Sequence, residues 1–477
     1  MASITSLGVG SSLDLSGLLD KLTTSESQPL VMLKSQQTSY TAKLSAYGTL
    51  QNALSSFQTA ASKLSEATLF QGAKASSSAS DVLTATASAS GTPGSYTVEV
   101  TKLATSQSLA AAGVVDATAA VGKGTVTIDF GRITGGTLGS DGKYTGAVFT
   151  PDASRAAQSI VIDDSNNSLE GLRDAINANA DIGVTASLVN DGSASPYRLL
   201  LSSKQTGEAS SMRISVTGDA SLQSLLNHDP AATQNLQQTA IAGNAGLTVN
   251  GLAVTSSTNT VAEAVQGVTM TLAKTGLSVL TVSHDSASVE TAVSNFVTAY
   301  NSLQSTASQL TKYDTEKKTG AALVGDSTLR TIQTRIRAAL NTPQAGEFQV
   351  LSKVGVSFQK DGTLALDATK LNAAFAGNRA AVAELFAGTG SNTGFGTQVA
   401  ALVDTFTSAD GMLKVATTGV KSTLKSLDTQ YAAGQIRVEA TVARYRTQFT
   451  QLDVLISSMT STASYLTQQF AAMSTTK

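Results

Sequence analysis

The sequence predicts an α+β multidomain protein in which long coiled-coil-like helices from both termini form a leg, with antiparallel β-rich head domains inserted between them. Two observations carry this prediction. Both terminal segments show helical spacing of apolar residues without proline, and the middle alternates apolar and polar residues between turn clusters. The length of 477 residues, at about 150 residues per domain, favours roughly three domains.

The N-terminal segment, residues 30–92, lies between Pro29 and Pro93 and spaces its apolar residues mainly by threes and fours. This spacing is typical of an amphipathic helix. It continues through Leu50, Leu54 and Phe57, and Gln37 interrupts it. The residues that we expect to form an N-terminal assembly seam are Leu30, Leu33, Tyr40, Leu44 and Tyr47.

The C-terminal segment contains no proline after Pro343, and one apolar row in it steps by seven from Leu424 to Leu466. A second row lies four residues further on. A seam held over four to six heptads favours coiled-coil packing, and such a helix would be roughly 80 Å long. The residues that we expect to form a C-terminal assembly seam are Tyr431, Val438, Tyr445, Phe449, Leu452, Ile456, Met459, Leu466 and Phe470.

These two seams allow two interpretations. The terminal helices could be long core helices of one large bundle. We favour helices that pack on each other and on neighbouring subunits, because both ends of the chain carry a seam.

The middle of the chain predicts antiparallel strands separated by turns. Ser168 is expected to cap a helix over 168–177, and Asn190–Gly192 predicts a tight turn between strands. We expect Leu200 to be buried in the head. After residue 285 the helical pattern returns, and a hairpin is expected between 354–358 and 364–366. The expected strands are 96–100, 125–130, 159–162, 197–201, 213–216 and 277–282.

The predicted domain organisation follows from these patterns. Residues 1–40 and 430–477 should form a coiled-coil leg that is flexible in the monomer. Residues 41–104 and 286–429 should form a helical domain with a small β-hairpin. Residues 105–285 should form the β-rich head, with one subdomain from about 105–125 with 240–285 and another from 126–239.

Composition excludes several classes of function. Charged residues make up only 14% and the net charge is −2, which gives no attraction to nucleic acid. Without cysteine there is no thiolate metal site, and His228 and His284 are the only histidines. No apolar run reaches about 18 residues, so the chain should not span a membrane. The start of the sequence lacks the basic and apolar regions of a cleaved signal peptide.

Three weak motifs do not point to chemistry. Gly8–Gly10 follows no predicted strand, and Leu13 stands where a dinucleotide fingerprint requires glycine. Asp163–Asn167 lacks the glycine and glutamate of a calcium loop. The sequence contains no nucleophile-elbow motif around a serine, so His284–Asp285 does not indicate a catalytic triad. We therefore expect no enzyme, and no catalytic, cofactor-binding or metal site.

Several strings that occur in order along the chain carry a family resemblance. They are Gly8–Asp14, Gly17–Leu22, Gln28–Leu30, Pro93–Val100, Leu169–Asn177, Gly325–Asp326, Asp361–Asp367 and Phe449–Asp453. The chain resembles the bacterial flagellar filament cap proteins, the FliD-type hook-associated proteins, over nearly its whole length. It departs at Ser12, where the family usually has glycine, and residues 105–165 and 218–240 are not recognisable.

The resemblance implies an oligomeric cap at the distal filament tip, usually a pentamer, outside the cell. Such a cap promotes flagellin folding and insertion, prevents flagellin leakage and is required for filament elongation. The resemblance further implies export by the flagellar type III apparatus without a cleaved signal. The implied partners are a second copy, flagellin, the hook–filament junction proteins and a cytoplasmic export chaperone that binds the C-terminal helix.

Two other functions stay open at this point. Another axial subunit, such as a junction protein or flagellin, would share coiled-coil ends but would lack the strings Pro93–Val100 and Asp361–Asp367. Adhesion to host mucin is a second role of some family members, although no sugar-binding constellation is visible in this sequence.

Overall fold

The computed structural model describes residues 13–316, 318–390 and 392–474, and the chain divides into two compact units. A helical unit comprises residues 1–70 and 286–477, and a β unit comprises residues 71–285. The expected boundary at residue 104 is therefore wrong. Residues 73–102 belong to the β unit because they form strands whose hydrogen-bonding partners all lie within residues 245–284.

The first helix of the helical unit is longer than its apolar spacing indicated. Helix α1 (Leu15–Leu64) begins at Asp14, whose Oδ1 accepts a hydrogen bond from the Gly17 backbone N–H at 2.9 Å. It continues through Pro29, although proline cannot donate the corresponding helical hydrogen bond. Leu15 and Leu19 are buried on this early part of the helix, so tertiary packing offsets the cost of the proline.

The rest of the helical unit packs against one face of the second half of α1. Its core contains the rings of Phe57 on α1 and of Phe296 and Tyr300 on α4, with centroids 5.2 and 5.7 Å from that of Phe57. The remaining helices are α4 (Ser286–Thr311), α5 (Ser327–Asn341), α6 (Ala368–Gly377), α7 (Arg379–Ala387), α8 (Phe395–Thr407) and α9 (Met412–Ser474). The short helices at the edges are η1 (Ala67–Gln71) and η4 (Leu351–Val354).

Among the described residues of the helical unit there are also three two-stranded hairpins. The pair β19 (Val356–Phe358) and β20 (Leu364–Leu366) confirms the predicted hairpin. The other two pairs are β17 (Tyr313–Asp314) with β18 (Thr319–Gly320), and β21 (Gly388–Thr389) with β22 (Asn392–Thr393).

The β unit contains two separate hydrophobic cores, and the first is enclosed by two antiparallel sheets. One sheet has the order β1-β16-β3-β12-β13, and the other has the order β14-β15-β2. Val98, Leu280 and Met270 are buried between them. The strands are β1 (Ala73–Ser77), β2 (Leu83–Ala87), β3 (Gly94–Lys102), β12 (Ala245–Val249), β13 (Leu252–Ser256), β14 (Thr260–Val265), β15 (Val268–Leu272) and β16 (Gly276–His284).

The second core of the β unit lies under two further sheets and two helices. One sheet has the order β10-β5-β6, with β7 also paired to β5, and the other has the order β11-β4-β9-β8. The elements are β4 (Ser108–Ala110), β5 (Gly124–Leu138), β6 (Tyr144–Pro151), β7 (Gln158–Ile162), α2 (Leu169–Ala178), η2 (Ala180–Ile182), β8 (Val184–Asn190), β9 (Tyr197–Ser203), η3 (Glu208–Ser210), β10 (Ser211–Gly218), α3 (Ala220–Leu226) and β11 (Gln237–Ala240).

The predicted strands and the capped helix at Ser168 are confirmed, but three finer expectations are wrong. Residues 105–125 do not join 240–285, because β4 pairs with β9 and Leu109 lies in the second core. Leu200 is only half-buried, since Leu199 and Leu201 take the inward positions of β9. Asn190–Gly192 is not a two-residue turn, because β8 ends at Asn190 and β9 starts at Tyr197.

Candidate assembly surface on the terminal helices

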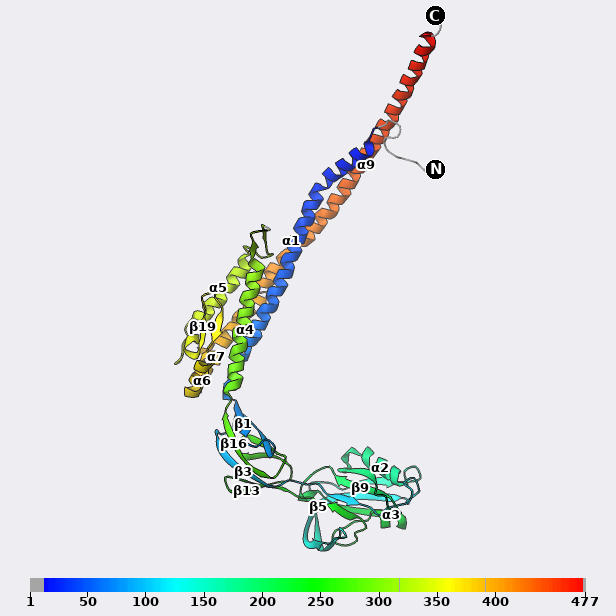
Figure 1. Ribbon diagram of the computed structural model, residues 1–477, viewed down its shortest axis with the longest axis vertical. Helices are drawn as coiled ribbons and strands as arrows, with labels where there is room; N and C mark the ends of the chain where they lie inside the picture. The colour runs from blue at the N-terminus through cyan, green and yellow to red at the C-terminus, as the bar shows by residue number, and fades with distance from the viewer. Residues whose placement is uncertain (1–12, 317, 391, 475–477) are drawn as a thin grey trace. The chain divides into compact units, whose positions relative to one another are not determined.

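The two longest helices run side by side in opposite directions, and this pairing brings the predicted seams together (Figure 1). The Gln37 side chain on α1 donates to Asp428 Oδ1 on α9 at 2.8 Å. One turn further along, the Lys34 Nζ lies 5.9 Å from the centroid of the Tyr431 ring. We call residues 15–40 of α1 and 428–474 of α9 the two-helix arm.

Packing within the two-helix arm is open around Leu30. A groove of about 410 Å³ lies between the helices there, and it is lined by Leu30, Leu33, Gly434 and Val438 among others. At one end of the groove, Tyr445 donates its hydroxyl to Glu26 Oε1, which lines the groove, at 3.2 Å. The arm is therefore held by a narrow apolar seam with polar contacts on both sides of the groove.

The predicted N-terminal seam is split between two environments. Leu30 and Leu33 are half-buried and face α9. Tyr40 and Leu44 are half-buried against the core of the helical unit, and Tyr47 lies inside that core. The residues from Tyr40 onward therefore stabilise the subunit itself.

The predicted C-terminal seam is covered along only part of its length. Its half-buried members are Tyr431, Val438, Tyr445, Phe449 and Ile456. The other four, Leu452, Met459, Leu466 and Phe470, are 38, 63, 47 and 67% exposed, and Tyr465 beside them is 61% exposed. Figure 1 shows why, since α9 continues beyond the start of α1. Within the described residues, nothing covers this apolar end of α9.

Other exposed apolar side chains on the arm lie off the heptad rows, and sequence reasoning did not single them out. Val31 and Met32 on α1 are 61 and 66% exposed, and Ile436 and Val454 on α9 are 68 and 66% exposed. Their only signal in the sequence is that an apolar residue stands outside the seam of a long helix. Apolar surface is therefore available on more than one side of the arm.

The end of α9 carries no charge to set the specificity of a contact. Residues 454–476 contain no Asp, Glu, Lys, Arg or His. A contact made there must depend on apolar burial and shape, and salt should affect it little.

The described residues contain no group of three or more His, Asp or Glu side chains that could hold a metal ion. Asp163 instead closes a local turn, since its Oδ1 accepts from the Ser165 N–H and from the Ser165 hydroxyl. These two hydrogen bonds lower the pKa of the Asp163 carboxyl. Gly8, Gly10 and Ser12 lie outside the described residues.

In the part of the chain that the structure describes, none of the helices combines the length and the apolar composition that a membrane-spanning helix requires.

Comparison with known proteins identifies the family. The chain matches "Flagellar hook-associated protein 2 N-terminus" over residues 11–107 and "Flagellar hook-associated protein 2 C-terminus" over residues 242–461. It is 42% identical to flagellar hook-associated protein 2 of Escherichia coli (strain K12), with all of both chains covered. The chain belongs to the flagellar hook-associated protein 2 family. Identity to the Salmonella typhimurium LT2 member of this family is 40%, with 99% of each chain covered.

A solved family member has the same fold. The crystal structure of the flagellar cap protein FliD D1-D2-D3 domains from Escherichia coli matches with a TM-score of 0.64 at 37% identity, covering 79% of this chain and 99% of that one. The predicted resemblance to the flagellar cap family is thereby confirmed, and the match over the full length favours it over the other axial subunits. Residues 108–241, which hold the second β core, lie between the two family matches.

Proposed function

We propose that this chain caps the distal end of the flagellar filament as a homo-oligomer, most simply a pentamer. In this proposal the ends of its terminal helices enter the filament end, where they promote the folding and insertion of flagellin subunits and prevent their leakage. The β unit would form the exposed plate of the cap. The family is that of flagellar cap proteins, and the details of assembly are the proposal.

The uncovered apolar end of α9 is the observation that carries the proposal. Met459, Tyr465, Leu466 and Phe470 leave most or about half of their surface in water. Burying a large apolar side chain stabilises a complex by about 1.5–3 kcal/mol. A subunit that exposes four of them on one helix gains free energy only when another molecule covers that helix.

Other partners would meet the same surface at earlier stages. A cytoplasmic export chaperone that covers the end of α9 would keep this apolar surface out of water before export through the flagellar type III apparatus. The hook–filament junction proteins would then provide the first site at which the cap settles outside the cell. The end of α9 carries no charged residue, so each of these partners would bind it through apolar contacts and not through a fixed pattern of ion pairs.

The experiment replaces the exposed end of the seam without touching the core. A chain with Met459→Gln, Leu466→Gln and Phe470→Gln should melt like the native protein, since these side chains are exposed in the subunit. Cells that carry it in place of the native cap should secrete flagellin and build no filaments, as counted by electron microscopy. Val415→Gln is the matched control, because Val415 is 63% exposed at the other end of α9. Normal filaments with the triple variant, or equal loss with the control, would contradict the proposal.

A further inference from the structure

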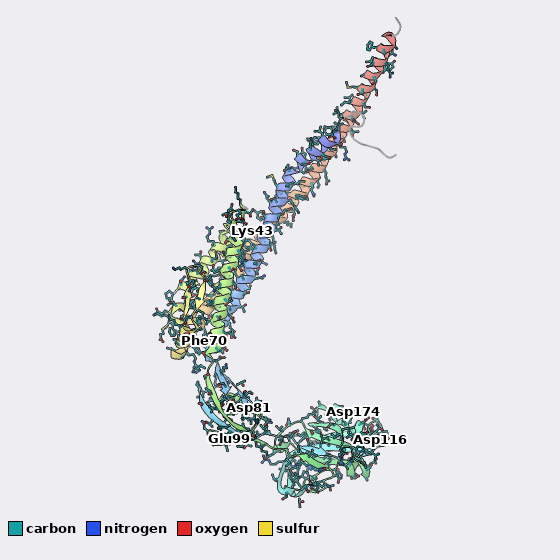
Figure 2. All side chains as sticks on the ribbon, in the orientation of Figure 1. Lys43, Phe70, Asp81, Glu99, Asp116 and Asp174 are labelled. Atoms are coloured by element: carbon teal, nitrogen blue, oxygen red, sulfur yellow. The ribbon has the colours of Figure 1, made fainter. Side chains whose placement is uncertain are left out.

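Helix α1 changes its surroundings abruptly near residue 45. Between Ala46 and Leu64 the helix contributes seven buried side chains to the core of the helical unit, among them Leu50, Leu54 and Phe57. Before Ala46, the buried residues of α1 are Leu15, Leu19 and Gln37. Figure 2 marks Lys43 on α1 close to this point, where the helix leaves its neighbours in the bundle.

Two side chains of α1 converge at this point on one carboxylate of another element. The Tyr47 hydroxyl donates to Asp326 Oδ2 at 2.6 Å, and Lys43 Nζ lies 2.8 Å from the same oxygen. The other oxygen, Oδ1, accepts from the Leu329 backbone N–H at 3.0 Å and thereby caps α5. Both oxygens of Asp326 are therefore engaged, and its side chain is only 4% exposed.

The electrostatics of the three groups agree with this geometry. Burial is the largest influence on Asp326 and raises its pKa, but hydrogen bonds from Lys43, Tyr47 and Leu329 N–H together hold the pKa below its usual value. The hydrogen bond to Asp326 raises the pKa of Lys43. Burial, followed by the Asp326 contact, raises the pKa of Tyr47. The carboxylate and the ammonium are thus both charged at neutral pH.

We infer that Lys43, Tyr47 and Asp326 form a polar clamp that sets the direction in which the two-helix arm leaves the helical unit, with Asp326 as the positioning residue. Apolar burial is non-directional, so it resists a small tilt of a helix only weakly. The two hydrogen bonds from Lys43 and Tyr47 to Asp326 resist it more strongly, because a tilt of α1 at this point changes their lengths and angles.

This inference deepens the proposed function, since the arm is the part that would enter the filament end. The direction of the arm at its base determines where its exposed apolar end lies. A subunit with a loosened clamp would keep all the apolar side chains of its seam and would still misplace them.

The test uses the absence of cysteine from the full chain. Spin labels on Val31→Cys in the arm and Arg335→Cys on α5 report the distance between the arm and the bundle. Lys43→Met removes the charge at similar side-chain length, and Lys43→Arg retains it. Lys63→Met is the matched control, because Lys63 on the same helix pairs with Glu66 at an exposed site. Asp326→Asn keeps a capping oxygen but loses the charge.

We expect a narrow distance distribution in the native chain, Lys43→Arg and Lys63→Met, and a broad one in Lys43→Met and Asp326→Asn. Amide exchange over residues 41–46 should become about ten-fold faster in Lys43→Met, as expected for the loss of one charge-assisted hydrogen bond. A distribution in Lys43→Met as narrow as in the native chain would overturn the inference, and so would equal broadening in Lys63→Met. Both measurements use purified protein, whereas the proposed function is tested by counting filaments on cells. The inference about the clamp can therefore be contradicted without contradicting the proposed function, and the reverse also holds.

Discussion

Gly434 on α9 lies directly against Leu30 on α1, so that a Cβ atom on Gly434 would stand 2.7 Å from Leu30 Cδ2. At the edge of the groove between the helices, the end of the Leu30 side chain therefore occupies the space beside the α9 backbone that a side chain at 434 would take. Glycine costs about 1 kcal/mol relative to alanine inside a helix. At Gly434, unlike at Gly419 in the same helix, an apolar side chain of α1 fills the space left by the missing Cβ atom.

Gly434→Leu should disturb the packing of the arm, because its Cβ atom would stand 2.7 Å from Leu30 Cδ2 and the Leu30 side chain would have to move. Overpacking of this kind costs about 1–3 kcal/mol. We expect faster amide exchange over residues 22–37 and 428–445, with the bundle core unaffected. Gly419→Leu is the control, since nothing lies within 4 Å of a Cβ at that position. Slow exchange in both variants would show that the approach of Leu30 does not hold the arm together.

Leu452→Asp should leave the melting of the isolated subunit nearly unchanged but prevent filament growth. Leu452 is 38% exposed in the subunit, so a carboxylate there stays in water until the arm is packed. Burying it unpaired in the assembled filament end would cost several kcal/mol. Scanning calorimetry and filament counts test the two halves of this prediction.

The control for Leu452→Asp is Leu201→Asp in β9. Leu201 is 1% exposed in the second β core, so its replacement should destabilise the subunit itself by about 3–5 kcal/mol. Equal losses of subunit stability in the two variants would mean that α9 near Leu452 is ordinary core.

His228 should make the β unit less stable in mild acid. Its side chain is buried, and neither ring nitrogen has a hydrogen-bond partner within the described residues. Burial lowers the pKa of His228 to about 4, against a pKa near 6.5 in the unfolded chain. The charge of Asp229 opposes this shift, and the charge of Lys143 adds to it.

Between these two pKa values the unfolded chain binds a proton that the folded chain does not. The stability that depends on neutral His228 is therefore complete above pH 6.5 and is lost as the pH falls toward 4, by about 2 kcal/mol at pH 5. Urea unfolding at a series of pH values from 7 to 5 measures how the free energy of unfolding changes with pH. His228→Phe should flatten it and His284→Gln should not, whereas a slope retained in His228→Phe would assign the effect to other groups.

Gln107 is a buried amide that the second β core depends on. It is fully buried, its Oε1 accepts from the Met212 N–H, and its Nε2 donates to Gln238 Oε1 at 2.7 Å. Gln107→Leu should cost about 2–4 kcal/mol of unfolding free energy, because it leaves two buried polar groups without a partner. Gln205→Leu, at an exposed position, should change stability by less than about 0.5 kcal/mol. Equal values from denaturant unfolding would contradict this role.

The periodicity of the sequence predicted most helices and strands, but it did not predict which neighbouring elements pack on their apolar residues. Tyr47 and Leu30 belong to one helical row, yet Tyr47 lies in the core while Leu30 faces α9 across an open groove. Both positions satisfy the same local spacing, and only the placement of α5 and α9 distinguishes them. In the same way, the leucines at 199–201 predicted a strand, but a run of three apolar residues does not indicate which of them point inward.

The sequence by itself determined the long helices at both ends, the antiparallel strands between them, the absence of thiol chemistry and the resemblance to flagellar cap proteins. The helices, the strands and the missing thiols follow from local spacing and composition, whereas the resemblance rests on the sequence strings that the chain shares with the family. Tertiary structure alone decided that residues 73–102 join the β unit, that the seam of α9 is covered only as far as Ile456, and that Lys43 meets Asp326. These contacts join residues far apart along the chain. They depend on long-range packing, which local backbone geometry does not encode.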